Sequence, residues 1–380
     1  MKIGLVCPYN MALGGAVQEI VKESYDELTK RGHDVVIISP HPKQGDPTHL
    51  TQRIVYIGRA GDPKSPLGTV GQVSTARRKE IDDVLNREQF DVVHMHEPWV
   101  PLSNKQILKR VTCPVVATFH AKLPDSWVAS AIKNVGRVYT APLLKHIDVC
   151  VAVSESAAEH ISAVLRKPVQ IIPNAVNLSA FTTPTKWEPI ESKKKTLLYV
   201  GRLEARKGVT YLLKAFKQLH EKYPDTQLLI GGNGPDRAAL EKQAIADGTG
   251  AVLFMGYLED AHKKELLQRA DLFCAPAIYG ESFGVILIEA LASGQVLVAG
   301  NNPGYRSVMK GFGDISLVNP KDQNAHAALL EKLLYDEDLR KKYRSWAQAY
   351  VKQYDYPVVT NQYEAIYKRL VAENSHGQKA

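Results

Sequence analysis

The chain has 380 residues, of which 44% are hydrophobic and 23% charged; this composition excludes disordered and fibrous proteins, and the length predicts two domains. Its formal net charge of +8 favours anionic partners such as nucleotides or anionic lipids, and no zinc-finger or RNA-recognition motif points to nucleic acid. No apolar run approaches the ~20 residues that span a bilayer, so we expect no transmembrane helix.

From the first residue onward, short β-branched runs alternate with amphipathic helical stretches. The strand-like runs are, in chain order, KIGLVCP, HDVVIISP, DVVHMH, PVVATFH, DVCVAV and VQIIP. This alternation is typical of a doubly wound sheet of parallel strands with helices on both faces. The first run turns polar before the apolar core of a signal peptide could form, so we expect a cytoplasmic protein.

A segment rich in Pro, Asn and Thr follows, and the alternation then restarts. The later strand-like runs are KTLLYVGR, TQLLIGG, VLFMGY, DLFCAP, QVLVAG and ISLVNP. We infer a second Rossmann-like domain, with the first domain at residues 1–175 and the second at residues 190–354. A helical pattern at residues 356–374 closes the chain, and we expect this helix to cross back to the first domain.

The four cysteines lie in strand-like runs without the spacing of metal ligands. They are Cys7, Cys113, Cys150 and Cys274. Scattered thiols of this kind are typical of a reduced, buried state rather than of a disulfide framework. We therefore predict neither a metal site nor a redox role.

The strongest local signal is the segment GESFGVILIEALASG, which places Glu281 and Glu289 eight positions apart. We expect Glu281 just before a helix and Glu289 about two turns inside it. Glu289 would lie on the buried stripe of the helix that faces a ligand-binding cleft. The backbone N–H groups left unpaired at this helix start would be those of Phe283, Gly284 and Val285. Such groups form an anion site suited to a diphosphate, while Glu289 can accept from ribose hydroxyls and Glu281 from a sugar. The spacing alone is equally consistent with a capped helix and a structurally paired glutamate.

A second signal is YVGRLEARKG, where Arg202 and Lys207 follow a predicted strand. Two cations at the carboxyl end of a strand can neutralise a diphosphate leaving group, and open α/β sheets bind ligands at that edge. A loop with solvated basic residues is the alternative.

The first domain offers two weaker candidates. Gly14 and Gly15 follow the first strand and let the backbone approach a phosphate, although a tight turn is the more common explanation. His120 ends the run VVATFH, where an imidazole can bind a sugar or stabilise charge; a satisfied structural histidine is the more common case. We expect His94 and His96 to point to opposite sides of their strand, so that at most one faces the cleft.

Taken in order along nearly the whole chain, the motifs GGAVQ, HMHEP, TFH, IPNAV, GRLEARKG, GGNGPD and GESFGVILIEALASG resemble those of retaining glycosyltransferase family four. The resemblance implies the GT-B fold, in which two Rossmann-like, doubly wound parallel-sheet domains face an inter-domain cleft. The segments CPYN, HMHEPWVP and QYDYPVVTNQYEAIY are most similar to the phosphatidylinositol α-mannosyltransferases of that family, which use GDP-mannose.

The resemblance also implies roles for single residues. On the donor side, Arg202 and Lys207 hold the diphosphate, Glu289 holds the ribose and Glu281 holds the sugar hydroxyls. His120 lies by the sugar near the reaction centre. Asp260 and Lys263 match the guanine-side positions, and an exposed first helix turn capped by Asp260 is the alternative. The remaining assignments are Gly15 and Ala16 to the donor, and Tyr9, Gln18 and His120 to the acceptor.

The chain departs from the family pattern at two places. Ala16 stands where the family loop has its second glycine, which bears on the close approach of the diphosphate. The basic residues Arg77, Arg78 and Lys79 are followed by Glu80, Asp82 and Asp83, so a purely basic membrane-docking helix is not preserved. We therefore expect at most weak binding to an anionic surface at the inner face of the cell membrane.

These observations predict a metal-independent, retaining hexosyltransferase that moves mannose from GDP-mannose to a polyol or glycolipid such as phosphatidylinositol. A nucleotide-sugar is its donor substrate and no further cofactor is implied. A UDP-sugar with another acceptor, an epimerase or hydrolase on the same fold, and a non-catalytic binding protein remain the alternatives.

Overall fold

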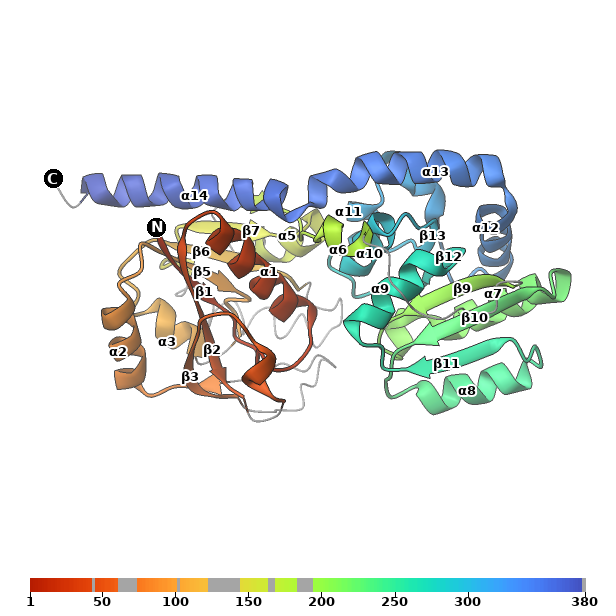
Figure 1. The fold of residues 1–380 in the computed structure, drawn as a ribbon, viewed down its shortest axis with the longest axis horizontal. Coiled ribbons are helices and arrows are strands. Elements are labelled where there is room, and N and C mark those ends of the chain that lie inside the picture. Colours follow the sequence, from red (N-terminus) through yellow and green to blue (C-terminus); the bar gives the residue numbers. More distant parts are fainter. Residues whose placement is uncertain are drawn as a thin grey trace. The chain divides into compact units, whose positions relative to one another are not determined.

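The computed structural model describes residues 1–42, 45–60, 74–100, 103–121, 144–162, 168–182 and 194–377 (Figure 1). The chain divides into two compact units. The first consists of Met1–Ala175 with Tyr356–Ala380, and the second of Val176–Asp355. Each unit is built around its own sheet.

The sheet of the first unit has eight strands in the order β4-β3-β2-β1-β5-β6-β7-β8. The strands are β1 (Lys2–Val6), β2 (Asp34–His41), β3 (Ile54–Ala60), β4 (Ser74–Thr75), β5 (Val92–His96), β6 (Val115–Phe119), β7 (Val149–Ala152) and β8 (Val169–Ile171). Neighbours pair in parallel except β3 and β4, which are antiparallel. The strands β5, β6 and β7 are buried along their whole length, as expected for parallel strands covered on both faces.

Helices of the first unit cover the sheet and tie the end of the chain to its beginning. They are α1 (Ala16–Lys30), α2 (Arg78–Glu88), α3 (Ser103–Leu108), α5 (Glu155–Ser162) and α14 (Tyr356–Gly377), with the short 3-10 helix η1 (Pro47–His49). The buried side chains of α14, among them Tyr356 and Tyr367, share one hydrophobic core with β1 and α1. Arg31, which follows α1, donates to the Pro357 carbonyl at 2.7 Å and to Glu364 at 2.8 Å.

The second unit holds a six-stranded parallel sheet in the order β11-β10-β9-β12-β13-β14. Its strands are β9 (Lys195–Val200), β10 (Thr226–Gly231), β11 (Val252–Gly256), β12 (Leu272–Ala275), β13 (Leu297–Gly300) and β14 (Leu317–Val318). Its helices are α6 (Leu178–Thr182), η2 (Ala205–Lys207), α7 (Val209–Lys222), α8 (Arg237–Ala246), α9 (Asp260–Arg269), α10 (Val285–Ala292), α11 (Pro303–Val308), η3 (Gly311–Ser316), α12 (Gln323–Tyr335), α13 (Glu337–Tyr350) and η4 (Val351–Tyr354).

The two ends of the second unit lie side by side. The backbone N–H of Val176 donates to the carbonyl of Tyr354 at 2.8 Å, and Val176 forms a parallel bridge with Asp355. The side chain of Asp355 accepts from the N–H of Leu178 at 3.3 Å. The second unit is therefore an insertion into the first, with its entry and exit hydrogen-bonded to each other.

The strand orders fix where ligands can bind. In the first sheet the order reverses beside β1, whose neighbours are β2 and β5, and in the second it reverses beside β9, whose neighbours are β10 and β12. Loops that leave the carboxyl ends of strands at such a switch point diverge and form the crevice in which open α/β sheets bind ligands. The segments that follow β1, β5, β9 and β12 are therefore the places to search for a site.

Candidate functional site

In the second unit, the loops after β9 and β12 approach each other closely. Gly208, between η2 and α7, has a φ of +70°, and a Cβ there would lie 2.1 Å from the carbonyl oxygen of Pro276. Only glycine meets both requirements, because a side chain would be strained and would clash. This packing brings the cations of the first loop to the carboxylate of the second.

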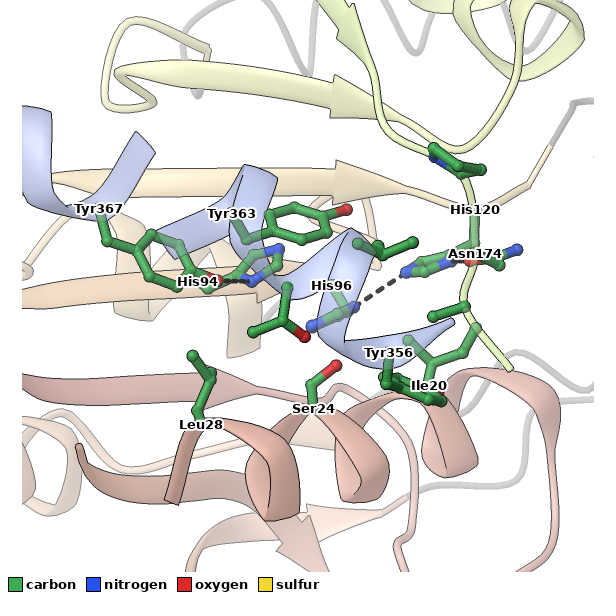
Figure 2. A pocket seen from close by; sticks show the side chains of 14 residues that line it. Ile20, Ser24, Leu28, His94, His96, His120, Asn174, Tyr356, Tyr363 and Tyr367 are labelled. Atoms are coloured by element: carbon green, nitrogen blue, oxygen red, sulfur yellow. Dashed lines mark hydrogen bonds between the residues drawn. The ribbon is translucent and has the colours of Figure 1, made fainter. Parts of the chain in front are cut away.

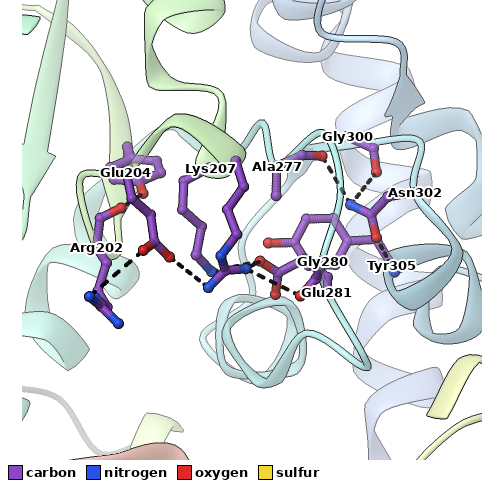
Figure 3. Close-up of polar contacts among 11 residues, drawn as sticks. Arg202, Glu204, Lys207, Ala277, Gly280, Glu281, Gly300, Asn302 and Tyr305 are labelled. Atoms are coloured by element: carbon purple, nitrogen blue, oxygen red, sulfur yellow. Dashed lines mark hydrogen bonds and ion pairs between the residues drawn. The ribbon is translucent and has the colours of Figure 1, made fainter. Parts of the chain in front are cut away.

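Charged side chains of these loops form an alternating chain, which we call the ion-pair cluster. Its members are Arg202, Glu204, Arg206, Lys207 and Glu281. Oε1 of Glu281 accepts from Lys207 Nζ at 2.7 Å and from Arg206 Nη1 at 2.8 Å (Figure 3). Arg206 also pairs with Glu204 at 2.7 Å, while Arg202 is 3.7 Å from Glu204 and half exposed. Arg202 is thus the cation of the cluster with the loosest pairing.

The backbone of Glu281 is fixed by the segment after β13. Asn302 caps α11 by accepting from the N–H of Tyr305 at 3.0 Å, and it donates to the carbonyl of Ala277 at 3.0 Å (Figure 3). A Cβ on Gly304 would lie 2.2 Å from the carbonyl oxygen of Glu281. Any larger residue at position 304 would therefore displace the carboxylate that the cations share.

The helix predicted from GESFGVILIEALASG begins later than expected. It is α10, which starts at Val285 with Gly284 as N-cap at a φ of +109°. Glu289 is therefore the fifth residue of the helix, little more than one turn inside it, and not two turns inside as predicted from the spacing to Glu281. The delay follows from the left-handed conformation of Gly284, which no helix interior contains, and from the buried Phe283 before it.

A second group of charges joins α9 to α10. Lys263 Nζ lies 3.0 Å from Glu289 and 3.0 Å from Asp260, and Lys264 also pairs with Asp260. Burial raises the pKa of Glu289, and the Lys263 ammonium opposes that rise. Burial alone would lower the pKa of Lys263, but the two carboxylates raise it. The residues expected at the guanine and at the ribose are thus one connected group, with Asp260 as the first helical residue and Glu259 as the N-cap.

In the first unit, the loop after β1 and the start of α1 place the predicted acceptor residues. Gln18 is buried and donates to the carbonyl of Asn10 at 3.4 Å, so its amide lies against its own loop. A Cβ on Gly15, the N-cap of α1, would lie 2.4 Å from Oε1 of Gln18. Ala16 is the first helical residue, a position that does not require glycine for its backbone. Tyr9 packs partly against the core, and its carbonyl accepts from Ser39 at 3.0 Å.

The expectation that His94 and His96 point to opposite sides of their strand is wrong. Residues two apart share one face of a strand, and the two rings lie 4.4 Å apart between centroids. His94 is held by Tyr367 at 2.6 Å and by Thr118 at 2.7 Å. It is a satisfied structural residue that fixes α14 to β5 and β6.

His96, His120 and Asn174 form a separate chain of hydrogen bonds. His96 Nδ1 lies 2.9 Å from His120 Nε2, and His120 Nδ1 lies 3.2 Å from Asn174 Oδ1 (Figure 2). Both ring nitrogens of His120 therefore have protein partners. We call His94, His96 and His120, with Thr118 and Asn174, the imidazole cluster.

The imidazole cluster is uncharged near neutral pH. Burial lowers the pKa of His94 to about 3 and the pKa of His120 to about 4, with Asn174 opposing the shift of His120. Burial and the neighbouring rings lower the pKa of His96 as well. An ion placed among these rings would lack a counter-charge, so the neutral forms are retained.

Glu97 fixes the backbone at His120. Its side chain is buried, and Oε1 accepts from the N–H groups of His120 and Ala121, each at 2.7 Å. Its own φ is +50°, an uncommon conformation for a residue with a side chain. Burial raises the pKa of Glu97 to about 7, and the two N–H donors oppose that rise. Glu97 thus joins the ends of β5 and β6.

The predicted residues therefore fall into separate groups. Arg202, Lys207 and Glu281 meet in the ion-pair cluster, and Asp260, Lys263 and Glu289 meet between α9 and α10. Sequence reasoning missed Glu204, Arg206, Glu97 and Asn174. A signal existed for all four, since Glu204 and Arg206 lie inside the quoted motif GRLEARKG, Glu97 inside HMHEP and Asn174 inside IPNAV, but a surface loop residue has the same appearance in a sequence.

The described residues hold neither a metal-binding group nor a membrane-spanning helix. They contain no group of three or more His, Cys, Asp and Glu side chains arranged to hold a metal ion. Among the helices of the described residues, none combines the length and apolar character needed to cross a membrane. The basic residues Arg77, Arg78 and Lys79 are exposed around the start of α2, while Glu80 accepts from the N–H of Gly58 and Asp82 pairs with Arg110.

Comparisons with known proteins agree with the geometry. Residues 14–180 match the family model described as Glycosyltransferase Family 4, and residues 183–350 match the one described as Glycosyl transferases group 1. The chain is 33% identical over 97% of its length to the phosphatidyl-myo-inositol mannosyltransferase of Mycolicibacterium smegmatis, covering 94% of that protein. It is 32% identical to the protein of the same name from Mycobacterium tuberculosis, with all of both chains covered.

Solved structures share the fold. A glycosyltransferase from Rickettsia africae matches with a TM-score of 0.78 at 20% identity, over 97% of this chain and 98% of that one. Anabaena HepE, in complex with UDP and glucose, matches with a TM-score of 0.76 at 15% identity, over 97% of this chain and 100% of that one. The two Rossmann-like sheets are thus those of the GT-B fold, and the chain belongs to glycosyltransferase family 4, the family of the phosphatidyl-myo-inositol mannosyltransferases.

Proposed function

We propose that the protein transfers mannose from GDP-mannose to the inositol head group of phosphatidylinositol, with retention of the anomeric configuration. The names of relatives that match over the whole chain support the sugar and the acceptor. The observation that carries the donor side is the ion-pair cluster, in which one carboxylate neutralises two cations that a diphosphate would also attract.

The first step of the proposal is an exchange of partners. In the structure Glu281 binds Lys207 and Arg206. A diphosphate carries more negative charge than one carboxylate and offers more acceptor oxygens, so Lys207 and Arg202 turn to it, and Arg206 follows in part. Glu281 then has free lone pairs for the hydroxyls of the transferred sugar. The helix start at Phe283, Gly284 and Val285 supports the diphosphate with backbone N–H groups.

The nucleoside is assigned to the charges between α9 and α10. Guanine presents adjacent N–H donors and a carbonyl acceptor, which the Asp260 carboxylate and the Lys263 ammonium can satisfy together. Glu289, 3.0 Å from the same ammonium, accepts from the ribose hydroxyls. Uracil lacks the paired donors, which favours GDP over UDP.

The transfer itself follows from these roles. The acceptor hydroxyl oxygen forms a bond to the anomeric carbon on the face from which the diphosphate leaves, and the bond from that carbon to the phosphate oxygen breaks. The acceptor proton passes to the departing diphosphate. Arg202 and Lys207 stabilise the charge that develops on the leaving group, which is a transition-state effect and so increases turnover.

The acceptor side is assigned to the first unit, with Tyr9, Gln18 and His120 near the head group and Gly15 and Ala16 near the donor phosphates. Arg77, Arg78 and Lys79 would give weak, salt-sensitive attachment to the inner face of the cell membrane. Sedimentation with phosphatidylinositol vesicles at low and high salt, beside neutral vesicles, measures this attachment. Equal binding to both kinds of vesicle would leave a soluble polyol as the better acceptor.

A donor screen tests the function as a whole. Purified protein is incubated with GDP-mannose, GDP-glucose, UDP-glucose and UDP-galactose, with and without phosphatidylinositol, and both nucleoside diphosphate release and glycolipid formation are measured. We expect release only with GDP-mannose and lipid together. Preference for a UDP-sugar would overturn the donor, and rapid release without an acceptor would indicate a hydrolase.

A further inference from the structure

A small cavity lies beside the imidazole cluster, within the first unit. Its volume is about 20 Å³, enough for one or two water molecules and too small for a sugar. The lining includes His96 from the end of β5, Ser24 from α1 and Thr360 from α14. Ser24 points toward His96 in Figure 2, and no direct hydrogen bond joins them among the described contacts.

The hydrogen bonds of the cluster run in one direction. Asn174 presents its amide oxygen to His120 Nδ1, so this nitrogen carries the hydrogen. A neutral imidazole then has a lone pair on Nε2, which accepts from His96 Nδ1. His96 is consequently the Nδ1–H form as well, and its own Nε2 carries a lone pair.

That last nitrogen lacks a partner. His96 is 2% exposed, and within the described part of the chain no group donates to its Nε2. Buried acceptors of this kind are nearly always satisfied, by protein or by ordered water. The neighbouring His94 ring cannot serve, because Thr118 and Tyr367 occupy both of its nitrogens, and Tyr363 hydrogen-bonds to Thr118.

We infer that a water molecule occupies this cavity and donates to His96 Nε2, and that His96 and Asn174 are positioning residues which hold His120 as a single neutral tautomer. The functional part of this inference rests on the proposed function, in which His120 lies near the acceptor head group, whose hydroxyl attacks the anomeric carbon. The groups that surround His120 and His96 from the packed elements are His94, Tyr363, Tyr367 and the carboxyl group of Glu97, which binds the backbone of His120.

The hydrogen-bond chain from Asn174 through His120 to His96, which we call the relay, has a consequence for the reaction. Glycosyl transfer passes through a state with positive charge at the anomeric carbon, which an imidazolium nearby would repel. With Nδ1 and Nε2 both engaged, His120 neither takes up nor releases a proton during the transfer. It contributes a fixed, uncharged wall and a fixed backbone.

Nuclear magnetic resonance tests the relay without any substrate. Long-range ¹H–¹⁵N spectra of histidine-labelled protein, assigned with single His→Asn variants, report which ring nitrogen carries hydrogen. We expect Nδ1–H and bare Nε2 for both His96 and His120 at pH 7. The Nε2–H form of either ring, or a charged His120, would overturn the relay even if mannosyl transfer is found. A crystal structure at high resolution should show water within hydrogen-bonding distance of His96 Nε2. A cavity without such a water would contradict that part of the inference.

A matched pair of variants separates positioning from packing. His96→Asn keeps an N–H donor at the place of Nδ1 and lacks Nε2, whereas His96→Leu lacks both. If the relay holds, His96→Leu lowers kcat about tenfold at nearly unchanged donor KM, and His96→Asn restores most of the loss. Thermal unfolding and the spectra of His120 establish that each variant is folded. Equal losses in both folded variants, with His120 unchanged in its tautomer, would contradict the positioning role.

Discussion

The two polar clusters occupy the same kind of place and use opposite chemistry. Both lie at the carboxyl-terminal side of parallel strands, the ion-pair cluster after β9 and β12 and the imidazole cluster within and just after β5 and β6, where Asn174 joins it from the segment after β8. The first consists of charges that compensate one another in a partly exposed loop pair, with side-chain exposure from 12% to 50%. The second consists of buried, neutral rings in which nearly every nitrogen has a fixed partner.

The two clusters differ in how easily their side chains can exchange partners. Partly exposed ion pairs are worth little energy in themselves, so they can be exchanged for pairs with a ligand at low cost. Buried neutral hydrogen bonds are costly to break, since the released group would stay unsatisfied. The second unit is therefore built to change partners, and the first is built to keep its geometry.

Acidification should separate the clusters most strongly. The folded pKa values of His94 and His120 are about 3 and about 4, that of His96 is also lowered, and the unfolded value is 6.5. Below pH 6.5 the unfolded chain therefore binds more protons than the folded chain, and the free energy of unfolding decreases as the pH decreases. Glu97 acts in the opposite direction. Its pKa is about 7 in the folded chain and 4.5 in the unfolded chain, so the folded chain binds one extra proton in that window, which offsets the destabilisation by one histidine. His94 and His120 against Glu97 leave about one net proton, so the first unit should lose on the order of 1.4 kcal/mol per pH unit between pH 6.5 and 4.5, and the lowered pKa of His96 adds to this loss.

Hydrogen exchange followed by mass spectrometry measures both units in one sample. Peptides from β5 and β6 should lose protection between pH 7 and pH 5, after correction for the intrinsic exchange rate, more than peptides from β9 and β12. In the second unit burial lowers the pKa of His326 to about 4, so the unfolded form of that unit takes up one more proton than the folded form in the same pH range. Equal loss in both units would break the comparison.

The next largest effect is expected at Glu281. Glu281→Gln removes the carboxylate that we propose accepts from the sugar hydroxyls, and it should lower kcat about 100-fold. GDP affinity should stay within about threefold of the wild type or rise, because the amide no longer competes for Lys207 and Arg206. Calorimetry with GDP and steady-state turnover give both numbers. Glu204→Gln is the control, since Glu204 pairs with Arg206 and is not assigned to the sugar. A large loss of GDP affinity in Glu281→Gln would contradict its role.

A smaller effect should follow at Arg202. Arg202→Ala should weaken GDP binding about tenfold, the size expected for one charge-assisted hydrogen bond, and leave guanosine binding unchanged. Calorimetry at two salt concentrations tests this, since the loss should shrink at high salt. Asp260→Asn is the matched comparison, for which guanosine and GDP should weaken together. If Arg202→Ala also weakens guanosine, the cation does not act on the diphosphate.

The smallest effect introduces a charge into the neutral cluster. Asn174→Asp places a carboxylate beside Nδ1 of His120 and should raise the pKa of that ring by about 1 to 3 units. Turnover should then fall about threefold between pH 8 and pH 6, relative to wild type over the same range, because a fraction of the rings becomes charged. Asn174→Ser keeps a neutral acceptor and is the control. An unchanged pH profile in Asn174→Asp, together with an unchanged His120 resonance, would show that the cluster tolerates charge.

Much of the fold is readable in the sequence. Buried parallel strands give uninterrupted β-branched runs, and the expected fold class is confirmed in both sheets. The antiparallel β4 has two residues and gives no pattern of its own. The predicted start of α10 was too early, because the sequence does not reveal that Gly284 adopts a left-handed backbone conformation and not a helical one.

The meeting of candidate residues could be predicted where two motifs follow neighbouring strands, and not where a contact depends on the path of a longer connection. Arg202, Lys207 and Glu281 lie in two motifs, and a parallel sheet brings the two loops together. Asn174 lies in the quoted motif IPNAV, far along the chain from His96, and its contact with His120 depends on the path of the segment after β8. A helical wheel or strand period cannot encode such a meeting, which is why these partners of His120 emerged only from the three-dimensional structure.

The hydrogen-bonded entry and exit of the second unit have a practical consequence for protein engineering. Val176 and Asp355 lie next to each other, so the segment between them is a closed loop of chain whose ends nearly coincide. Such a segment can be excised as a separate gene, or replaced by a short turn that rejoins the remaining chain from Ala175 to Tyr356. The two units can in this way be produced, titrated and evolved as independent modules.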